Sequence, residues 1–67
     1  MNKWALIYWD ENTHCWIWRT YDDHIPLKEG PLDAAQNRKV PELTLFTAFQ
    51  QQVSSRIHTS DIVVENF

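Results

Sequence analysis

Two short runs of aromatic and β-branched residues, separated by one polar stretch, constrain the fold of this chain more than any other feature of its sequence. The runs are residues 3–9 (KWALIYW) and 15–21 (CWIWRTY), and residues 10–14 (DENTH) lie between them. Aromatic and β-branched side chains favour strands, and a polar gap of this length favours a turn. The pattern predicts a β-hairpin over residues 3–21 with a loop of about four or five residues.

Both faces of this hairpin are apolar, although an antiparallel pair in a small protein commonly has one apolar and one polar face. The sequence leaves the pairing register open. One register pairs Trp9 with Cys15 and divides the hairpin into two faces, one with Trp4, Leu6, Tyr8, Trp16, Trp18 and Thr20, the other with Ala5, Ile7, Trp9, Cys15, Ile17 and Arg19. Each plausible register leaves both faces largely apolar, so the second face needs a cover as well.

Residues 41–57 carry the clearest helical pattern. Their apolar side chains recur at intervals of one, three, four and four positions, at Leu45, Phe46, Phe49, Val53 and Ile57. Such a stripe indicates an amphipathic helix of about 16 residues. Pro41 suits a first helical turn, and Glu42 suits the positive end of the helix dipole.

Residues 22–40 separate the hairpin from this helix and are predicted to be irregular. They hold the only glycine and two of the three prolines, and the residue before a proline avoids the α region. A short helix over residues 32–39 stays open as an alternative. After the main helix, the β-branched run Ile62-Val63-Val64 predicts a last strand over residues 61–67.

These elements predict one α+β domain over residues 1–67, because a chain of this length has room for a single hydrophobic core. The expected architecture is an antiparallel three-stranded sheet in ββ-α-β order, with the main helix packed on one face. A domain this small has little stability to spare. It must pack its large side chains well or gain stability from a partner chain.

Charge and cysteine content narrow the classes of function. The net charge is −3 at pH 7 and the six Lys and Arg residues are scattered, whereas a nucleic-acid-binding protein usually presents a basic face. Direct binding to nucleic acid is therefore not expected. A single cysteine excludes an internal disulfide and favours a reducing compartment, and no apolar run is long enough to span a bilayer. We expect a cytoplasmic protein with no membrane association.

Candidate catalytic and metal-binding residues are few. The set that most resembles metal ligands is His14, Cys15, His24 and His58, but zinc sites commonly have paired ligands two to four residues apart. Cys15 as a nucleophile would need a nearby base, for which His24 is a candidate. No glycine-rich segment follows Cys15 to supply oxyanion donors. We therefore predict no enzyme, no metal site and no cofactor.

The aromatic residues of the hairpin are the strongest functional signal. One helix covers only one sheet face, and Trp and Tyr are enriched at the energetic hot spots of interfaces. We therefore predict that an aromatic hairpin face docks on a partner, through Trp4, Tyr8, Trp9, Trp16, Trp18 and Tyr21. The acidic pairs at the strand ends offer further contacts to a basic partner surface, through Asp10, Glu11, Asp22 and Asp23.

These features predict a protein–protein interaction module, either an inhibitor or an adaptor, that occludes a site on a larger protein complex such as a nucleic-acid-processing enzyme. In size, mild acidity and predicted ββ-α-β order, the chain resembles the small inhibitors encoded by phages and other mobile elements, including anti-CRISPR proteins. The resemblance covers no sequence motif. Two alternatives stay open: an obligate homodimer, and a single-stranded nucleic-acid binder that stacks bases on the sheet aromatics.

Overall fold

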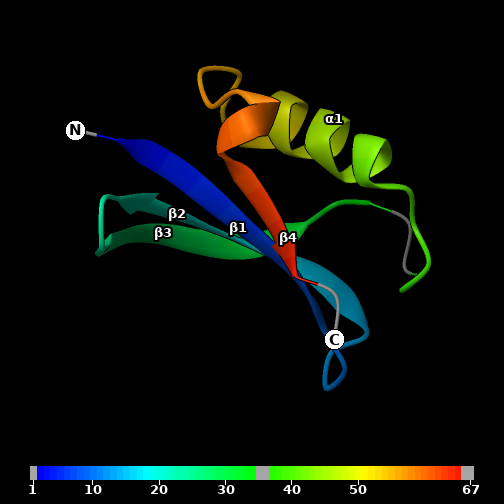
Figure 1. Cartoon of the computed structure of the whole chain (residues 1–67). Coiled ribbons are helices and arrows are strands. Elements are labelled where there is room, and N and C mark those ends of the chain that lie inside the picture. The colour runs from blue at the N-terminus through cyan, green and yellow to red at the C-terminus, as the bar shows by residue number, and fades with distance from the viewer. Residues whose placement is uncertain (1, 35–36, 66–67) are drawn as a thin grey trace.

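The computed structural model describes residues 2–34 and 37–65, which form a four-stranded sheet with one helix on one face (Figure 1). The elements are β1 (Lys3–Asp10), β2 (Cys15–Asp22), β3 (Ile25–Leu32), α1 (Glu42–Gln52), a 3₁₀ turn (Thr59–Asp61) and β4 (Ile62–Glu65). The strand order across the sheet is β3-β2-β1-β4. β1 pairs antiparallel with β2 and parallel with β4, and β2 pairs antiparallel with β3.

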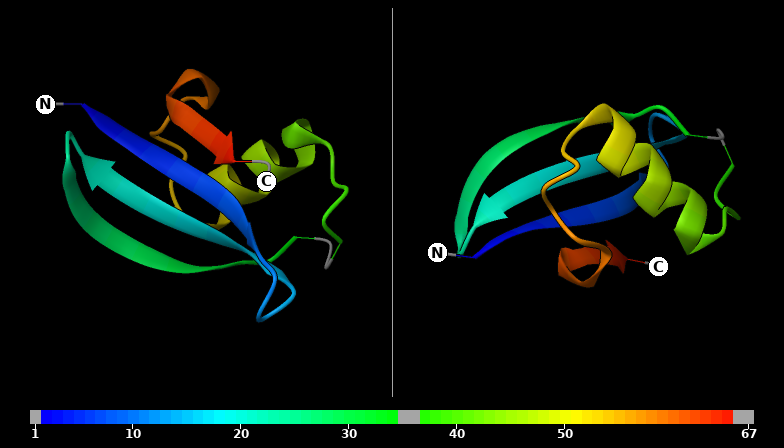
Figure 2. Two further views of the ribbon diagram at one scale, coloured as in Figure 1. Left: turned by 60° about the horizontal axis from the view of Figure 1, so that its bottom comes forward. Right: turned by 90° about the horizontal axis from the view of Figure 1, so that it is seen from above.

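The α+β class is confirmed, but the expectation of three antiparallel strands is wrong. β3 lies within the segment that was expected to be irregular, and β4 joins the sheet in parallel. The route of the chain explains the parallel pairing. β3 forms one edge of the sheet and runs in the same direction as β1, and the chain then crosses the sheet through α1 to the other edge (Figure 2). A crossover of this kind delivers the next strand parallel to the one that it left.

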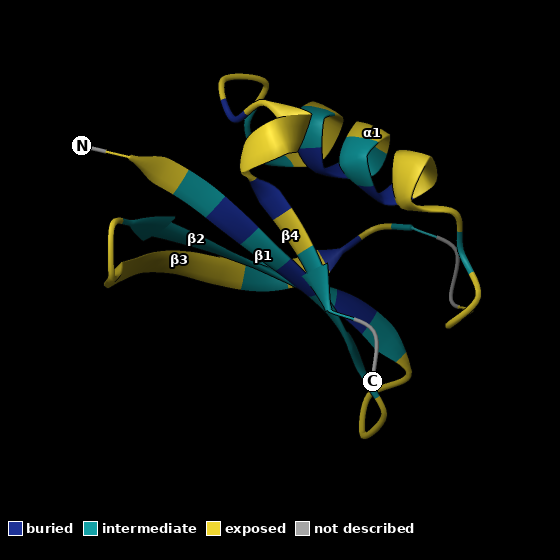
Figure 3. Ribbon diagram, viewed as in Figure 1, coloured by how far each residue is buried: buried dark blue, intermediate teal, exposed yellow. Residues whose placement is uncertain are grey.

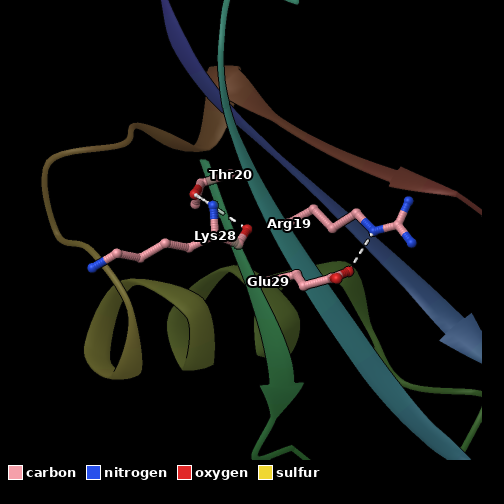
Figure 4. Close-up of polar contacts among 4 residues, drawn as sticks. All are labelled: Arg19, Thr20, Lys28 and Glu29. Atoms are coloured by element: carbon pink, nitrogen blue, oxygen red, sulfur yellow. Dashed lines mark hydrogen bonds and ion pairs between the residues drawn. The ribbon is translucent and has the colours of Figure 1, made fainter. Parts of the chain in front are cut away.

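β3 forms despite Pro26 and Pro31 because it is an edge strand. Proline cannot donate a hydrogen bond to a ladder, so it is tolerated where its nitrogen faces away from the sheet. On the inner side, the Lys28 backbone N–H donates to the Thr20 hydroxyl (3.2 Å), and that hydroxyl also lies 3.4 Å from the Lys28 carbonyl (Figure 4). These bonds hold β3 to β2 beside the register shift, which leaves Leu27 without a partner residue on β2.

The only glycine, Gly30, is required by packing and not by its backbone conformation. It pairs with Trp18, and a Cβ at this position would lie only 3.1 Å from the indole ring. Positive φ values occur instead at His14 (52°) and Asp23 (54°), in the turns of the two hairpins. Gly30 therefore gives the Trp18 indole room to lie flat against β3.

The first hairpin is confirmed, with a loop of residues 11–14, and the structure decides its register. Trp9 pairs with Trp16 and Asp10 pairs with Cys15, so the register that pairs Trp9 with Cys15 is wrong by one residue. A shift of one residue moves every side chain of one strand to the opposite face. As a result, Trp4, Leu6 and Tyr8 share a face with Cys15, Ile17, Arg19 and Tyr21.

The main helix is confirmed, but it ends earlier than its apolar stripe predicts. α1 has 11 residues, so Val53 and Ile57 lie beyond its end. The last helical bond joins the Val53 N–H to the Phe49 carbonyl (2.8 Å), and the Ser54 hydroxyl then accepts a bond from the Arg56 N–H (3.2 Å). Serine hydroxyls that bond to nearby backbone groups compete with the helix, which explains the early end.

The remaining predicted segments are partly revised. Residues 32–34 and 37–39 contain no helix, and residues 35–36 lie outside the described part of the chain. The last strand begins one residue later than predicted, because Asp61 belongs to the 3₁₀ turn, and β4 covers Ile62–Glu65. Residues 66–67 of the predicted strand lie outside the described part. Within residues 2–34 and 37–65, no helix has the length and apolar character needed to cross a membrane.

The hydrophobic core lies between α1 and one face of the sheet (Figure 3). Its buried residues come from all four strands, from α1 and from the loop that follows it: Ala5, Ile7, Trp16, Leu32, Leu45, Phe49, Ile57 and Ile62. The helix lies on this side only, as the views in Figures 1 and 2 show. The opposite face of the sheet therefore has no second layer among the described elements.

Candidate partner-binding face

The sheet face that points away from α1 carries a set of adjacent apolar and aromatic side chains. Successive residues of a strand alternate between faces, so the even-numbered residues of β1 point away from the core that Ala5 and Ile7 occupy. The pairing register places odd-numbered residues of β2, and Val63 of β4, beside them. We call this surface the open face, and it comprises Trp4, Leu6, Tyr8, Ile17, Arg19, Tyr21 and Val63.

The open face is accessible to solvent. Val63 is 49% exposed, and the other members are partly buried, by neighbours within the same sheet. Adjacent exposed apolar residues of this kind commonly mark a contact site.

Trp4 and Tyr21 form an aromatic stack at one end of the open face. They are directly opposite in the β1–β2 ladder, with ring centroids 4.3 Å apart and planes inclined by 11°. The Trp4 indole N–H donates to the Asp23 carbonyl (2.7 Å). Because each ring is held by the other and the indole N–H is already bonded, the pair is preorganised. A partner that contacts it therefore orders few additional rotamers on binding.

Arg19 lies at the centre of the open face, on β2. Its guanidinium is 5.1 Å from the centre of the Tyr8 ring, and its Nε donates to the Glu29 carboxylate (3.0 Å; Figure 4). The Tyr21 hydroxyl and then the Glu29 carboxylate raise the pKa of Arg19 above its ordinary value, so this group stays charged at physiological pH. The side chain is still 43% exposed. An exposed arginine set among tyrosines is typical of interface hot spots.

A hollow of about 250 Å³ lies beside Arg19, between β2 and β3. Its lining consists of Arg19, Tyr21, Pro26, Leu27, Lys28 and Glu29. The volume is below the about 300–1,000 Å³ that is common for small-molecule sites. The hollow is therefore better suited to one side chain of a partner protein than to a substrate.

The charges of the open face are arranged with a cation at the centre and carboxylates at the rim. Asp10 ends β1, Glu29 lies on the edge strand β3, and Glu65 lies on the edge strand β4 next to Tyr8. In the part of the chain that the structure describes, Arg19 is the only cation on this face. One guanidinium and three carboxylates give the face and its rim a net charge of −2.

The six aromatic residues predicted to contact a partner do not share one face. The open face holds Trp4, Tyr8 and Tyr21, whereas the side toward α1 holds Trp9, Trp16 and Trp18. Trp16 is 2% exposed, so the prediction that it contacts a partner is wrong. Alternation along β1 places Trp9 on the face opposite Trp4 and Tyr8 in any register. The one-residue difference in register accounts for the β2 residues, because it turns Trp16 and Trp18 toward the core.

Two of the three core-side tryptophans donate their indole N–H to a backbone carbonyl. The Trp16 indole N–H donates to Asn37 (3.0 Å) and the Trp18 indole N–H donates to Pro31 (3.1 Å). The Trp9 indole nitrogen is buried and has no partner among the described residues. Two of these three indoles are thus satisfied inside the fold, which lets bulky polar-tipped rings occupy the core side of the sheet.

The four acidic residues predicted as partner contacts lie at opposite ends of the first hairpin. Asp10 ends β1 and Glu11 lies in the loop, whereas Asp22 is the last residue of β2 and Asp23 follows it. A strand of this length spans about 24 Å, at about 3.4 Å per residue. Glu11 is bound to Arg38 (2.8 Å). The four residues therefore do not form one acidic patch. Asp10 and Asp23 border the open face at opposite ends, Asp23 through the bond that its carbonyl accepts from Trp4.

The cysteine and histidine residues are also separated. Cys15 begins β2 and His24 lies beyond the other end of that strand, so His24 cannot act as a base for Cys15. The Cys15 sulfur instead lies 3.0 Å from the Thr13 hydroxyl. Across residues 2–34 and 37–65, no three His, Cys, Asp or Glu side chains come together in a way that could hold a metal ion.

Four members of the open face were not predicted as site residues: Leu6, Ile17, Arg19 and Val63. That prediction is based on the aromatic residues of the hairpin and does not consider the residues that lie between them on the same face. Alternation along β1 and β2 identifies the first three once the register is known. No local signal identifies Val63, because its place depends on long-range parallel pairing between β4 and β1.

Comparisons with known proteins identify no relative of this chain. No protein-family model, no curated protein and no solved structure matches the chain. The functional argument therefore depends on the open face and its chemistry.

Proposed function

We propose that this chain is a protein-binding module that docks on a larger protein through its open face, and that it acts as a small inhibitor or adaptor. The single observation that carries the proposal is the uncovered, aromatic side of the sheet, which lies opposite the face that packs against α1. Burying this surface in an interface is favourable, because it removes from water the apolar area that folding leaves exposed.

The residue types of the open face support protein binding over the other classes. Interface hot spots are enriched in Trp, Tyr and Arg, and these types occur together at Trp4, Tyr21, Tyr8 and Arg19. A surface that stacks single-stranded nucleic acid combines aromatic rings with a positively charged groove. Here the face and its rim carry a net negative charge, which disfavours the phosphate backbone.

A matched pair of variants tests the proposal. Val63→Asp places a charge on the open face, whereas Leu43→Asp places one on the outer side of α1, where Leu43 is 72% exposed. The immobilised wild type and both variants are incubated with a bacterial lysate, and the bound proteins are identified by mass spectrometry. We expect one larger protein or complex that the wild type and Leu43→Asp retain and that Val63→Asp loses.

Circular dichroism on each variant confirms that the fold is intact before binding is compared. A partner that the two variants retain equally would contradict the proposal, because it would bind elsewhere on the molecule.

A homodimer is the second candidate, since the outer edge of β4 has no neighbouring strand among the described residues. An unpaired edge can extend its sheet with a second copy. Light scattering at tens of micromolar separates the two possibilities. A monomer at this concentration contradicts an obligate dimer.

A further inference from the structure

The charges around the open face carry information about the partner that the apolar residues alone do not. Glu29 and Glu65 lie on the two edge strands, Asp10 lies at the end of β1, and Arg19 lies between them. Arg19 and Glu29 form an ion pair, with the Arg19 Nε 3.0 Å from the Glu29 carboxylate, so their charges balance each other. The charge that stays unbalanced on this surface is therefore that of Asp10 and Glu65.

From this arrangement we infer that the partner presents an apolar patch flanked by Lys or Arg side chains, which meet the carboxylates of Asp10 and Glu65, both unpaired among the described residues. The inference rests on the proposed function and specifies its partner. Complementary rim charges mainly accelerate association and exclude wrong partners, whereas the apolar centre supplies most of the affinity.

The spacing of these two acidic residues defines the required basic surface. Glu65 pairs with Tyr8, and Asp10 lies two residues further along β1. Neighbouring strands are about 4.8 Å apart and two residues of a strand span about 6.8 Å, so the two backbone positions are about 8 Å apart. This separation is close to the Debye length of about 8 Å at physiological salt. One basic cluster on the partner can therefore meet both carboxylates.

The same charges argue against a second copy as the occupant. Two open faces packed against each other would bring a combined charge of −4 into one interface, and like charges that meet across an interface are costly. Nucleic acid is disfavoured by the same sign. A basic-rimmed protein surface is the occupant that satisfies both the apolar centre and the rim.

The test uses a display library of random peptides, selected at low salt on the immobilised wild-type protein. Binding of the selected peptides is then measured at about 0.05 M and about 0.5 M NaCl, where the Debye length falls from about 14 Å to about 4 Å. The variants are the double substitution Asp10→Asn/Glu65→Gln and the control Glu42→Gln, which removes an exposed carboxylate on α1. Asparagine at position 10 can still accept the bond from the Asn12 N–H.

We expect the selected peptides to combine apolar residues with Lys or Arg and to bind more weakly at high salt. The double substitution should weaken binding about two- to thirtyfold at low salt, as expected for the loss of two exposed ion pairs, and should flatten the salt dependence. Glu42→Gln should leave the affinity and its salt dependence unchanged. Thermal unfolding of each variant shows that the fold is retained.

Two other results overturn the inference in distinguishable ways. Peptides that lose binding with Val63→Asp but show no enrichment in Lys or Arg overturn the basic partner and leave the proposed function standing. Peptides that bind Val63→Asp as well as they bind Leu43→Asp overturn both. A wild-type dimer that Val63→Asp converts to a monomer assigns the open face to a second copy and also overturns the inference.

Discussion

Replacing Phe49 by alanine tests whether the core between α1 and the sheet supplies most of the stability of the fold. Phe49 is 0% exposed, and its ring makes an edge contact with Trp18 at a centroid distance of 6.2 Å. Phe→Ala substitutions in cores cost about 3–5 kcal/mol. A domain of this size has a free energy of unfolding of about 3–10 kcal/mol. The variant should therefore be unfolded or only marginally stable at room temperature.

The assay is urea and thermal unfolding followed by tryptophan fluorescence, with Leu43→Ala as the matched control on the same helix. A loss of 3 kcal/mol lowers Tm by about 12–24 °C, at about 4–8 °C per kcal/mol for a domain of this length. Leu43 is 72% exposed, so its truncation should cost less than about 0.5 kcal/mol. If the two variants lose similar stability, or if Phe49→Ala loses less than about 1 kcal/mol, the assignment of the core is wrong.

Two further substitutions test the edge strand β3. Gly30→Ala should destabilise the fold by about 0.5–2 kcal/mol, because the added methyl group would crowd the Trp18 indole, which its bond to Pro31 holds in place. This cost outweighs the stabilisation that alanine gives by lowering the conformational entropy of the unfolded chain. A variant that is more stable than the wild type in urea unfolding refutes the tight contact. Glu29→Gln should cost less than about 1 kcal/mol, because Arg19 and Glu29 are 43% and 64% exposed. A loss of more than about 2 kcal/mol in the same assay, undiminished at high salt, would mean that this pair is structural.

Local patterns are sufficient for the first hairpin and for the main helix. The two aromatic runs predict β1 and β2 to within one residue at each end, because strand propensity and the polar loop are both properties of adjacent residues. The helical stripe likewise predicts α1, and it fails only at the end. Val53 and Ile57 lie on the predicted stripe, but Ser54 and Ser55 favour turns over a continued helix, so the chain reaches the core at Ile57 by a loop.

The third strand could not be predicted from such patterns. Pro26 and Pro31 argue against a strand in any segment, and only a position at the edge of the sheet removes the objection. Trp18 stabilises this segment as a strand, since its indole lies against Gly30 and donates to the carbonyl of Pro31. Both contacts join residues that are more than ten positions apart, beyond the reach of periodicity.

The candidate site divides in the same way. The sequence by itself determined that the hairpin is apolar on both faces and that one helix can cover only one of them, because side-chain type and alternation are local properties. Only the tertiary structure decided which face is open. That choice depends on a shift of one residue between β1 and β2, which buries Trp16 and places Tyr8, Arg19 and Tyr21 on the open face. The loop and the burial of one face together set the register of a hairpin. Here the buried face is the one that packs against α1, and that contact joins segments far apart in the sequence, which no local pattern encodes.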